Sequence, residues 1–158
     1  MPTRKIRDMA NTFSSLHYHV VFSTKDREPW ISREMESRLW SYLAGIALEN
    51  DMKPLRIGGM PDHVHALLTI PAKMSVSIAV QRLKGPSSKW IHEEFPKMRG
   101  FAWQDGYGAF TIGKSQIKSV DTYIANQREH HRVRTFQEEF VMFLKRYEIE
   151  YDPKYLWG

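Results

Sequence analysis

The sequence predicts an α+β protein with a ferredoxin-like, split βαβ sandwich, in which an antiparallel sheet carries helices on one face. Segments with strand and helix periodicity follow one another as strand, helix, strand, strand, helix, strand. The 158 residues are enough for one domain core and too few for two. We expect a basic, flexible N-terminal segment at residues 1–12 and a single domain at 13–158, with a further tyrosine-bearing helix near the C-terminus.

The first half of the chain is predicted to form a strand, a helix and a hairpin. Residues 16–23, LHYHVVFS, alternate in polarity and are rich in β-forming residues. Residues 31–50 have apolar side chains at helical spacing behind Ser32, a typical N-cap residue. Residues 52–60 and 63–70 flank a turn with Pro and Asp, which predicts an antiparallel hairpin.

The second half continues with helices and one strand region. Residues 75–95 have helical periodicity, which we expect to be interrupted at Pro86. The aromatic, turn-rich residues 101–113 predict one or two short strands, and residues 115–131 predict one helix. A last helix begins near Thr135, where a threonine and a glutamate have capping-box spacing.

Composition narrows the function classes. The chain has 23 Lys and Arg against 18 Asp and Glu, a formal charge of +5 that favours an anionic partner. The absence of cysteine excludes disulfides, thiolate metal sites and cysteine nucleophiles, so a metal would need His, carboxylate or amide ligands. No apolar run approaches the roughly 20 residues of a membrane span, and we expect a cytoplasmic protein with no membrane partner.

Two histidines stand one residue apart at the start of an apolar strand. Because side chains alternate along a strand, His63 and His65 share one face while the other face is apolar. The two imidazoles can therefore converge on one metal ion, but such a pair also occurs as a polar face toward solvent. His17 and His19 have the same spacing, so the pattern alone does not identify the site.

A tyrosine and a glutamine share one face of the helix predicted at 115–131. Tyr123 and Gln127 are four residues apart, turned away from the apolar stripe of that helix. An amphipathic helix with a half-buried tyrosine and a solvated glutamine would give the same pattern.

The motifs, in this order, resemble those of the single-tyrosine HUH transposases of the IS200 type. The resemblance is carried by HVH after GGMPD, by YIANQ, and by the phrases YHVVFSTKDR, LKGPSSKWI, WQDGYGAFTIG and NQREHHRVRTFQEEF, which together cover nearly the whole chain. It implies that Tyr123 is the catalytic nucleophile and that His63, His65 and Gln127 hold a divalent metal, Mg²⁺ or Mn²⁺. His19 is implied to be structural or near the DNA, and Pro86 departs from the unbroken second helix expected of the family.

The resemblance also implies the reaction and the partners. The protein would cleave and rejoin single-stranded DNA at insertion-sequence ends through a covalent 5′-phosphotyrosine intermediate, and it would recognise DNA hairpins. No nucleotide cofactor is implied, which agrees with the absence of a phosphate-binding loop motif. A homodimer is implied, in which the tyrosine helix serves either its own subunit or the partner.

Basic and aromatic side chains are candidates for contacts with DNA. The candidates for backbone contacts are Lys84, Lys89, Arg128, Arg132 and Arg134. The candidates for stacking on bases are Trp90, Trp103 and Tyr107. For each of these residues a solvated charge or a core aromatic is the default explanation, and a DNA contact is the alternative. His130 and His131 could lie behind the metal ligands or near DNA, although solvent exposure is their default.

Three other functions remain open. A domesticated nucleic-acid-binding protein on the same fold would have lost catalysis, which the intact set of histidines, tyrosine and glutamine disfavours. A replication-initiator or relaxase-like nickase uses the same motif, but such proteins are usually larger. A small metallohydrolase would use the histidine pair without Tyr123, so it would stay active after Tyr123→Phe.

Overall fold

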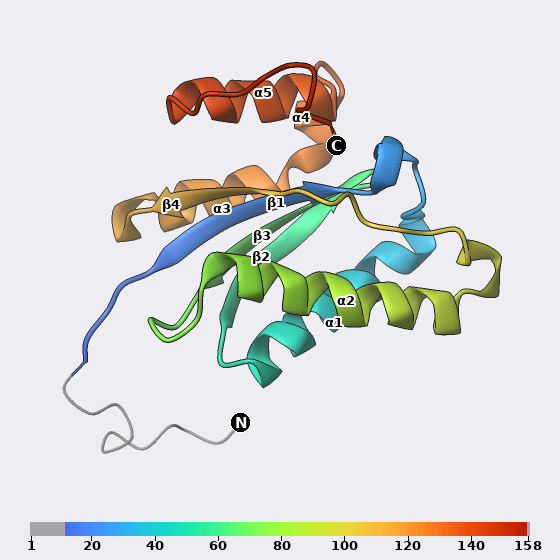
Figure 1. The fold of residues 1–158 in the computed structure, drawn as a ribbon, viewed down its shortest axis with the longest axis horizontal. Helices are drawn as coiled ribbons and strands as arrows, with labels where there is room; N and C mark the ends of the chain where they lie inside the picture. The colour runs from blue at the N-terminus through green and yellow to red at the C-terminus, as the bar shows by residue number, and fades with distance from the viewer. Residues whose placement is uncertain (1–11, 158) are drawn as a thin grey trace.

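The computed structural model describes residues 12–157 and contains a four-stranded antiparallel sheet (Figure 1). The strands are β1 (His17–Ser23), β2 (Lys53–Met60), β3 (His63–Thr69) and β4 (Gly108–Ile112). Their spatial order is β2-β3-β1-β4, and both hairpin strands and the first strand lie where the sequence predicts them. The predicted α+β, ferredoxin-like fold is therefore confirmed. Residues 1–11 of the predicted N-terminal segment lie outside the described residues.

Helices α1 (Arg33–Glu49) and α2 (Val76–Glu94) cover one face of the sheet (Figure 1). The Ser32 hydroxyl accepts a hydrogen bond from the Met35 N–H at 3.3 Å, so α1 begins at its predicted cap. The alternate residues of β3 that point toward these helices form the main core. They are Val64, Ala66 and Leu68, followed by Ile70, and each is at most 2% exposed.

The interruption predicted for the second helix is wrong, because α2 runs unbroken through Pro86. Proline lacks an N–H, so one carbonyl of the preceding turn loses its helical donor. Gly85 and Pro86 are exposed, which leaves that turn accessible to water. On the buried side, the Ser87 hydroxyl donates to the Leu83 carbonyl at 2.6 Å and adds a bond to the helix.

The face that carries the histidines is also covered, by α3 (Ile117–Ala125), α4 (Gln127–His131) and α5 (Phe136–Arg146) (Figure 1). The single helix predicted at 115–131 is therefore wrong. Asn126 has φ −103° and ψ 29°, which ends α3, and α4 starts directly after it in a new direction. Tyr123 and Gln127 consequently belong to two short helices that meet at Asn126.

The last helix, α5, begins at the predicted capping box. The Thr135 hydroxyl accepts from the Glu138 N–H at 3.2 Å, and the Glu138 carboxylate accepts from the Thr135 N–H at 3.3 Å. Its apolar side chains pack on Val21 and Phe110 of the sheet. They are Phe136, Phe140, Phe143 and Leu144. Short 3₁₀ turns complete the described chain, at Lys25–Arg27, Pro96–Met98 and Lys114–Gln116.

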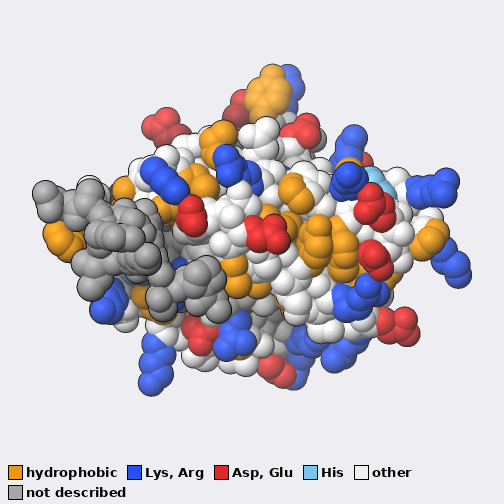
Figure 2. Space-filling model, turned by 90° about the horizontal axis from the view of Figure 1, so that it is seen from below, with side chains coloured by type: hydrophobic (Ala, Val, Ile, Leu, Met, Phe, Trp, Pro, Cys, Tyr) orange, Lys and Arg blue, Asp and Glu red, His pale blue; other side chains and the backbone are white. Residues whose placement is uncertain are grey.

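The opposite side of the molecule is a mixed-charge surface. Figure 2 shows it from below, the side of α1 and α2, with lysine and arginine interspersed among aspartate and glutamate. Arg38 of α1 pairs with Glu94 of α2 at 3.1 Å, and Lys73 pairs with Asp51 at 2.8 Å. Exposed pairs of this kind add little stability, and we regard this side as an ordinary solvated surface.

Candidate active site

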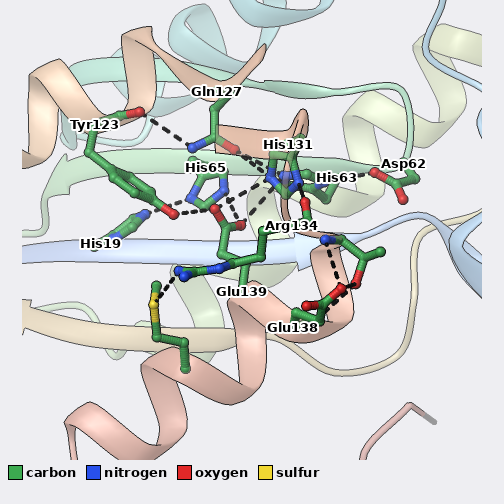
Figure 3. Close-up of polar contacts among 12 residues, drawn as sticks. His19, Asp62, His63, His65, Tyr123, Gln127, His131, Arg134, Glu138 and Glu139 are labelled. Carbon is green, nitrogen blue, oxygen red and sulfur yellow. Dashed lines mark hydrogen bonds and ion pairs between the residues drawn. The ribbon is translucent and has the colours of Figure 1, made fainter. Parts of the chain in front are cut away.

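Two neighbouring strands bring a row of histidines to the sheet face below α4 and α5. His63 and His65 alternate along β3 and His19 lies on β1, and each is at most 3% exposed. His65 Nδ1 is 2.7 Å from His19 Nε2, and His63 Nδ1 is 2.7 Å from Asp62 Oδ1. With their Nδ1 atoms engaged in this way, His63 and His65 turn their Nε2 atoms toward Gln127 and Glu139 (Figure 3).

The glycine pair before the β2–β3 turn allows close packing at this point. A Cβ atom at Gly59 would lie 2.1 Å from the His63 carbonyl oxygen, a distance that no side chain can occupy. A Cβ at Gly58 would lie 3.0 Å from the side chain of Ile124 in α3. These glycines therefore let β2 pair beside His63 and let the tyrosine helix approach the sheet.

Gln127, the first residue of α4, points its amide oxygen at two imidazoles. It is 2% exposed, and its Oε1 is 3.1 Å from both His63 Nε2 and His131 Nε2. Its amide nitrogen donates to the Tyr123 carbonyl oxygen at 3.4 Å, which fixes the orientation of the amide. The structure thus brings together the predicted residues Tyr123, Gln127, His63 and His65.

A carboxylate from α5 lies at the centre of the cluster. Glu139 is 1% exposed, and its Oε1 is 2.9 Å from His65 Nε2 and 3.6 Å from His63 Nε2. Its Oε2 is 3.4 Å from His131 Nε2 and accepts a hydrogen bond from the Tyr123 hydroxyl (Figure 3). Glu139 therefore contacts residues from β3, α3 and α4 at once.

Burial and the shared carboxylate shift the pKa values of the cluster. Burial lowers the pKa of His65 from 6.5 to about 4, against the opposing effect of its bond to Glu139. Burial alone would raise the pKa of Glu139, but hydrogen bonds with His131 and His65 outweigh it and hold that pKa far below its usual value. Burial, and then the bond to Glu139, raise the pKa of Tyr123, so its hydroxyl is neutral near pH 7.

The donor set suits a divalent metal ion. One ligand atom from each of His63, His65, His131 and Glu139 can be chosen so that all lie within 4.8 Å of one another. His131 Nδ1 lies 2.7 Å from the Arg134 carbonyl oxygen. The other ring nitrogen of His131, Nε2, faces Gln127 and Glu139. Imidazole nitrogens facing amide and carboxylate oxygens need either protons or a cation between them. Imidazole nitrogens together with carboxylate oxygens are ligands for divalent metal ions.

Sequence reasoning missed Glu139 as a member of the site and left His131 as exposed by default. Both residues lie in the phrase HHRVRTFQEEF. A signal was present, because the cap at Thr135 fixes where α5 begins and Glu139 then lies in the same helical stripe as Phe136 and Phe140. A charged residue in an apolar stripe is uncommon and indicates a buried partner.

The predicted arginines lie on and after α4, and each has a partner within the chain. Arg128 binds both carboxylate oxygens of Glu36, and Arg132 lies 3.2 Å from Glu129. The Arg134 guanidinium lies 2.6 Å from the Met142 sulfur (Figure 3). The DNA contacts of these three arginines stay predictions. The bond to Glu36 also shows that Arg128 joins α4 to α1.

The other predicted DNA contacts belong to the far side of the sheet. Lys84 donates to the Gln104 and Gly106 carbonyl oxygens at 2.8 and 2.6 Å, and burial lowers its pKa to about 8. Lys89 is exposed on the same helix, 4.0 Å from Glu93.

The three aromatic side chains predicted to stack on bases differ in their exposure to solvent. Trp103 is 7% exposed in the core, Trp90 stacks on Tyr42 with ring centroids 4.5 Å apart, and Tyr107 is 37% exposed. Trp103 is therefore wrong as a residue that stacks on bases.

The rival histidine pair is separated by the structure. His19 joins the cluster through its contact with His65. His17, two residues earlier on β1, instead binds the hydroxyl of Thr69, its partner on β3, at 2.8 Å. His19 thus lies behind the candidate metal ligands, and His17 lies outside the cluster.

Comparisons with known proteins agree with the fold and the motifs. The family described as "Transposase IS200 like" matches residues 12–127. The transposase for insertion sequence element IS200 of Salmonella typhimurium is 34% identical over 133 residues, which are 80% of this chain and 86% of that protein. The ISDra2 transposase TnpA of Deinococcus radiodurans is 27% identical over 72% of this chain and 85% of its own length.

Solved structures share the architecture. A crystal structure of a candidate transposase from Deinococcus radiodurans R1 superposes with a TM-score of 0.63 and 26% identity, over 80% of this chain and 98% of that one. A REP-associated tyrosine transposase bound to a REP hairpin has a TM-score of 0.55 at 12% identity, over 83% of this chain and 74% of that one. The second likeness concerns the fold alone. In the part of this chain that the structure describes, no helix is long and apolar enough to span a membrane.

Proposed function

The chain belongs to the IS200-like transposase family, and we propose that it cleaves and rejoins single-stranded DNA at the ends of an insertion sequence. Tyr123 attacks the scissile phosphate and becomes linked to the 5′ phosphate. The substrate is a strand that folds into a hairpin near each end of the element, and the protein works in the cytoplasm as a homodimer. Arg134, whose carbonyl oxygen binds His131, and Arg132, two residues before it, are basic residues that would contact the strand.

One observation carries this proposal. The Tyr123 hydroxyl and His65 Nε2 bind the two oxygens of the same buried carboxylate, that of Glu139. The side chain of Glu139 therefore links the candidate nucleophile, Tyr123, to the residues that would hold a divalent ion. His63, His65 and Gln127 would hold Mn²⁺ or Mg²⁺, which, when bound, draws charge from the phosphate oxygens and stabilises the transition state.

The residues of the chain account for the remaining steps. The Tyr123 oxygen forms a bond to phosphorus as the bond from phosphorus to the 3′ oxygen breaks, the phenolic proton is released, and the 3′ oxygen takes up a proton. The bond energy is kept in the phosphotyrosine ester, so no nucleotide cofactor is needed. A 3′ hydroxyl of another end attacks the same phosphorus, releases Tyr123 and joins the strands.

Electrophoresis of labelled DNA tests this function. Single strands from the flanks of the gene, chosen for imperfect palindromes, are incubated with the protein and Mn²⁺ or Mg²⁺ and separated on a denaturing gel. We expect a protein-linked DNA band that requires the metal, disappears with Tyr123→Phe and His63→Ala, and persists with Tyr147→Phe. Tyr147 is a suitable control because its hydroxyl binds the Thr111 carbonyl oxygen, outside the site.

Other results would identify the alternatives. Cleavage that survives Tyr123→Phe would indicate a metallohydrolase. Tight binding without cleavage, on strands that carry the hairpin, would indicate a domesticated binding protein. A linked band that forms at one fixed site and is not rejoined to a second end would indicate a nickase of the replication-initiator or relaxase type.

A further inference from the structure

Glu139 has a position that a structural carboxylate would not need. A buried carboxylate is costly unless it is paired and hydrogen-bonded, yet Glu139 is 1% exposed on a helix that otherwise packs through phenylalanine and leucine. Its neighbour Glu138 satisfies the capping box on the exposed side of the same turn. The capping box therefore does not require a second glutamate, and Glu139 faces the site instead.

The two oxygens of Glu139 face different halves of the site. Oε1 lies 2.9 Å from His65 Nε2 and 3.6 Å from His63 Nε2, on the side where the metal would bind. Oε2 accepts the hydrogen bond of the Tyr123 hydroxyl and also lies 3.4 Å from His131 Nε2. Gln127 is oriented differently, because its amide oxygen faces histidines and its amide nitrogen donates to the Tyr123 carbonyl oxygen.

We propose that Glu139 is both a metal ligand and the residue that positions the nucleophile, so that α5 is a working part of the active site. This inference rests on the function proposed above. One carboxylate oxygen completes the ligand set of His63, His65 and Gln127. The other holds the Tyr123 hydroxyl beside that ion, so that the tyrosine oxygen is delivered to a phosphate bound on the metal side of the carboxylate.

The packing of α5 determines this placement. Phe136 and Phe140 anchor the first turns of the helix, and the ring of Trp157 near the C-terminus packs on both, with centroids 6.3 and 6.0 Å away. His63 stacks on Phe136 at 4.7 Å, which joins the helix directly to a candidate ligand. The rotation of α5 that buries these rings also directs Glu139 inward.

Three measurements on the full chain test the inference. Calorimetric titration with MnCl₂ compares the wild type with Glu139→Gln and with the matched control Glu138→Gln, which keeps a capping-box side chain. Carbon-13 NMR of labelled tyrosine follows the Tyr123 ring carbon bonded to oxygen, identified by its loss in Tyr123→Phe. The rate of the protein-linked DNA band is then measured for each protein at saturating Mn²⁺.

For Glu139→Gln we expect Mn²⁺ affinity to fall by about tenfold or more, the Tyr123 resonance to shift, and the rate at saturating Mn²⁺ to remain at least about tenfold lower. Glu138→Gln should match the wild type in all three. Unchanged Mn²⁺ affinity would overturn the ligand role, and an unchanged resonance or a rate fully restored by Mn²⁺ would overturn the positioning role.

The design separates failure of this inference from failure of the proposed function. If the wild type forms no linked DNA, the proposed function fails, while the Mn²⁺ and NMR results still decide the two roles of Glu139. If Glu139→Gln does not fold, Glu139→Asp replaces it as the test variant. Aspartate keeps the negative charge, but its carboxylate lies one methylene group further from the histidines and Tyr123. The same losses are expected for that variant, and wild-type behaviour would contradict the inference.

Discussion

Arg128 of α4 donates to both carboxylate oxygens of Glu36 of α1, at 2.9 and 2.8 Å. The pair joins segments 92 residues apart in the sequence and holds the start of α4 against the body of the protein. Arg128 directly follows Gln127, so the pair also fixes the side chain that faces His63.

Breaking this pair should impair catalysis more than stability. We expect Glu36→Gln to lower the rate of the protein-linked DNA band several-fold, because the orientation of Gln127 loosens. The free energy of unfolding should fall by about 1 kcal/mol or less, since both partners are partly exposed. Glu93→Gln, on an exposed pair far from the site, is the control. Equal rates for the two variants would show that Arg128 does not position Gln127.

His19 should raise the metal affinity of the site through its contact with His65. Its Nε2 lies 2.7 Å from His65 Nδ1, which fixes the ring and the tautomer of His65. We therefore expect His19→Asn to weaken Mn²⁺ binding by about 10- to 100-fold. His17→Asn removes the other histidine of that strand, which binds Thr69, and should leave Mn²⁺ affinity unchanged. A comparable loss in both variants would contradict the distinction between the two histidines.

Acid should destabilise the metal-free protein through His65. Its pKa is about 4 in the fold and 6.5 when unfolded, so the unfolded state binds the proton first as the pH falls. The stability contributed by neutral His65 is complete above pH 6.5 and is lost between pH 6.5 and 4, by about 3 kcal/mol at most. Denaturant unfolding in the presence of a chelator should show this loss in the wild type. The loss should be smaller in His65→Asn, and equal pH profiles for the two proteins would refute the assignment.

Gly59 of β2 should contribute strongly to the stability of the fold. In Gly59→Ala the new Cβ would lie 2.1 Å from the His63 carbonyl oxygen, so the strand pair must shift. We expect a loss of about 2 kcal/mol or more in the free energy of unfolding. Gly45→Ala is the matched control, because nothing lies within 4 Å of its Cβ and alanine favours the interior of α1. That variant should be stabilised by up to about 1 kcal/mol, and thermal melting distinguishes the two outcomes.

Local periodicity was sufficient to predict the strands and the pairing of the two histidines. Residues on one face of a strand recur every second position, so His63 and His65 had to share a face wherever the strand lay. The caps at Ser32 and Thr135 likewise depend on hydrogen bonds from a backbone N–H only three residues later. Such features are decided within one element and are visible in the sequence.

The remaining features depend on how elements dock. Asn126 breaks the tyrosine helix without a proline or glycine, and Pro86 leaves α2 intact because that part of the helix is exposed. Glu139 reaches the histidines only because α5 folds back over β1 and β4, 74 residues away from its partner His65. The helical stripe marks Glu139 as buried, but no periodicity says which residues it contacts, so the sequence could not place this carboxylate at the centre of the site.

Mass spectrometry of the protein after incubation with a flanking single strand and Mn²⁺ tests the central claim most directly. After nuclease and trypsin digestion, we predict a nucleotide phosphate on the peptide of residues 119–128, attached to Tyr123. An adduct on a different residue, or cleaved DNA with a free 5′ phosphate and an unmodified Tyr123, would contradict the account.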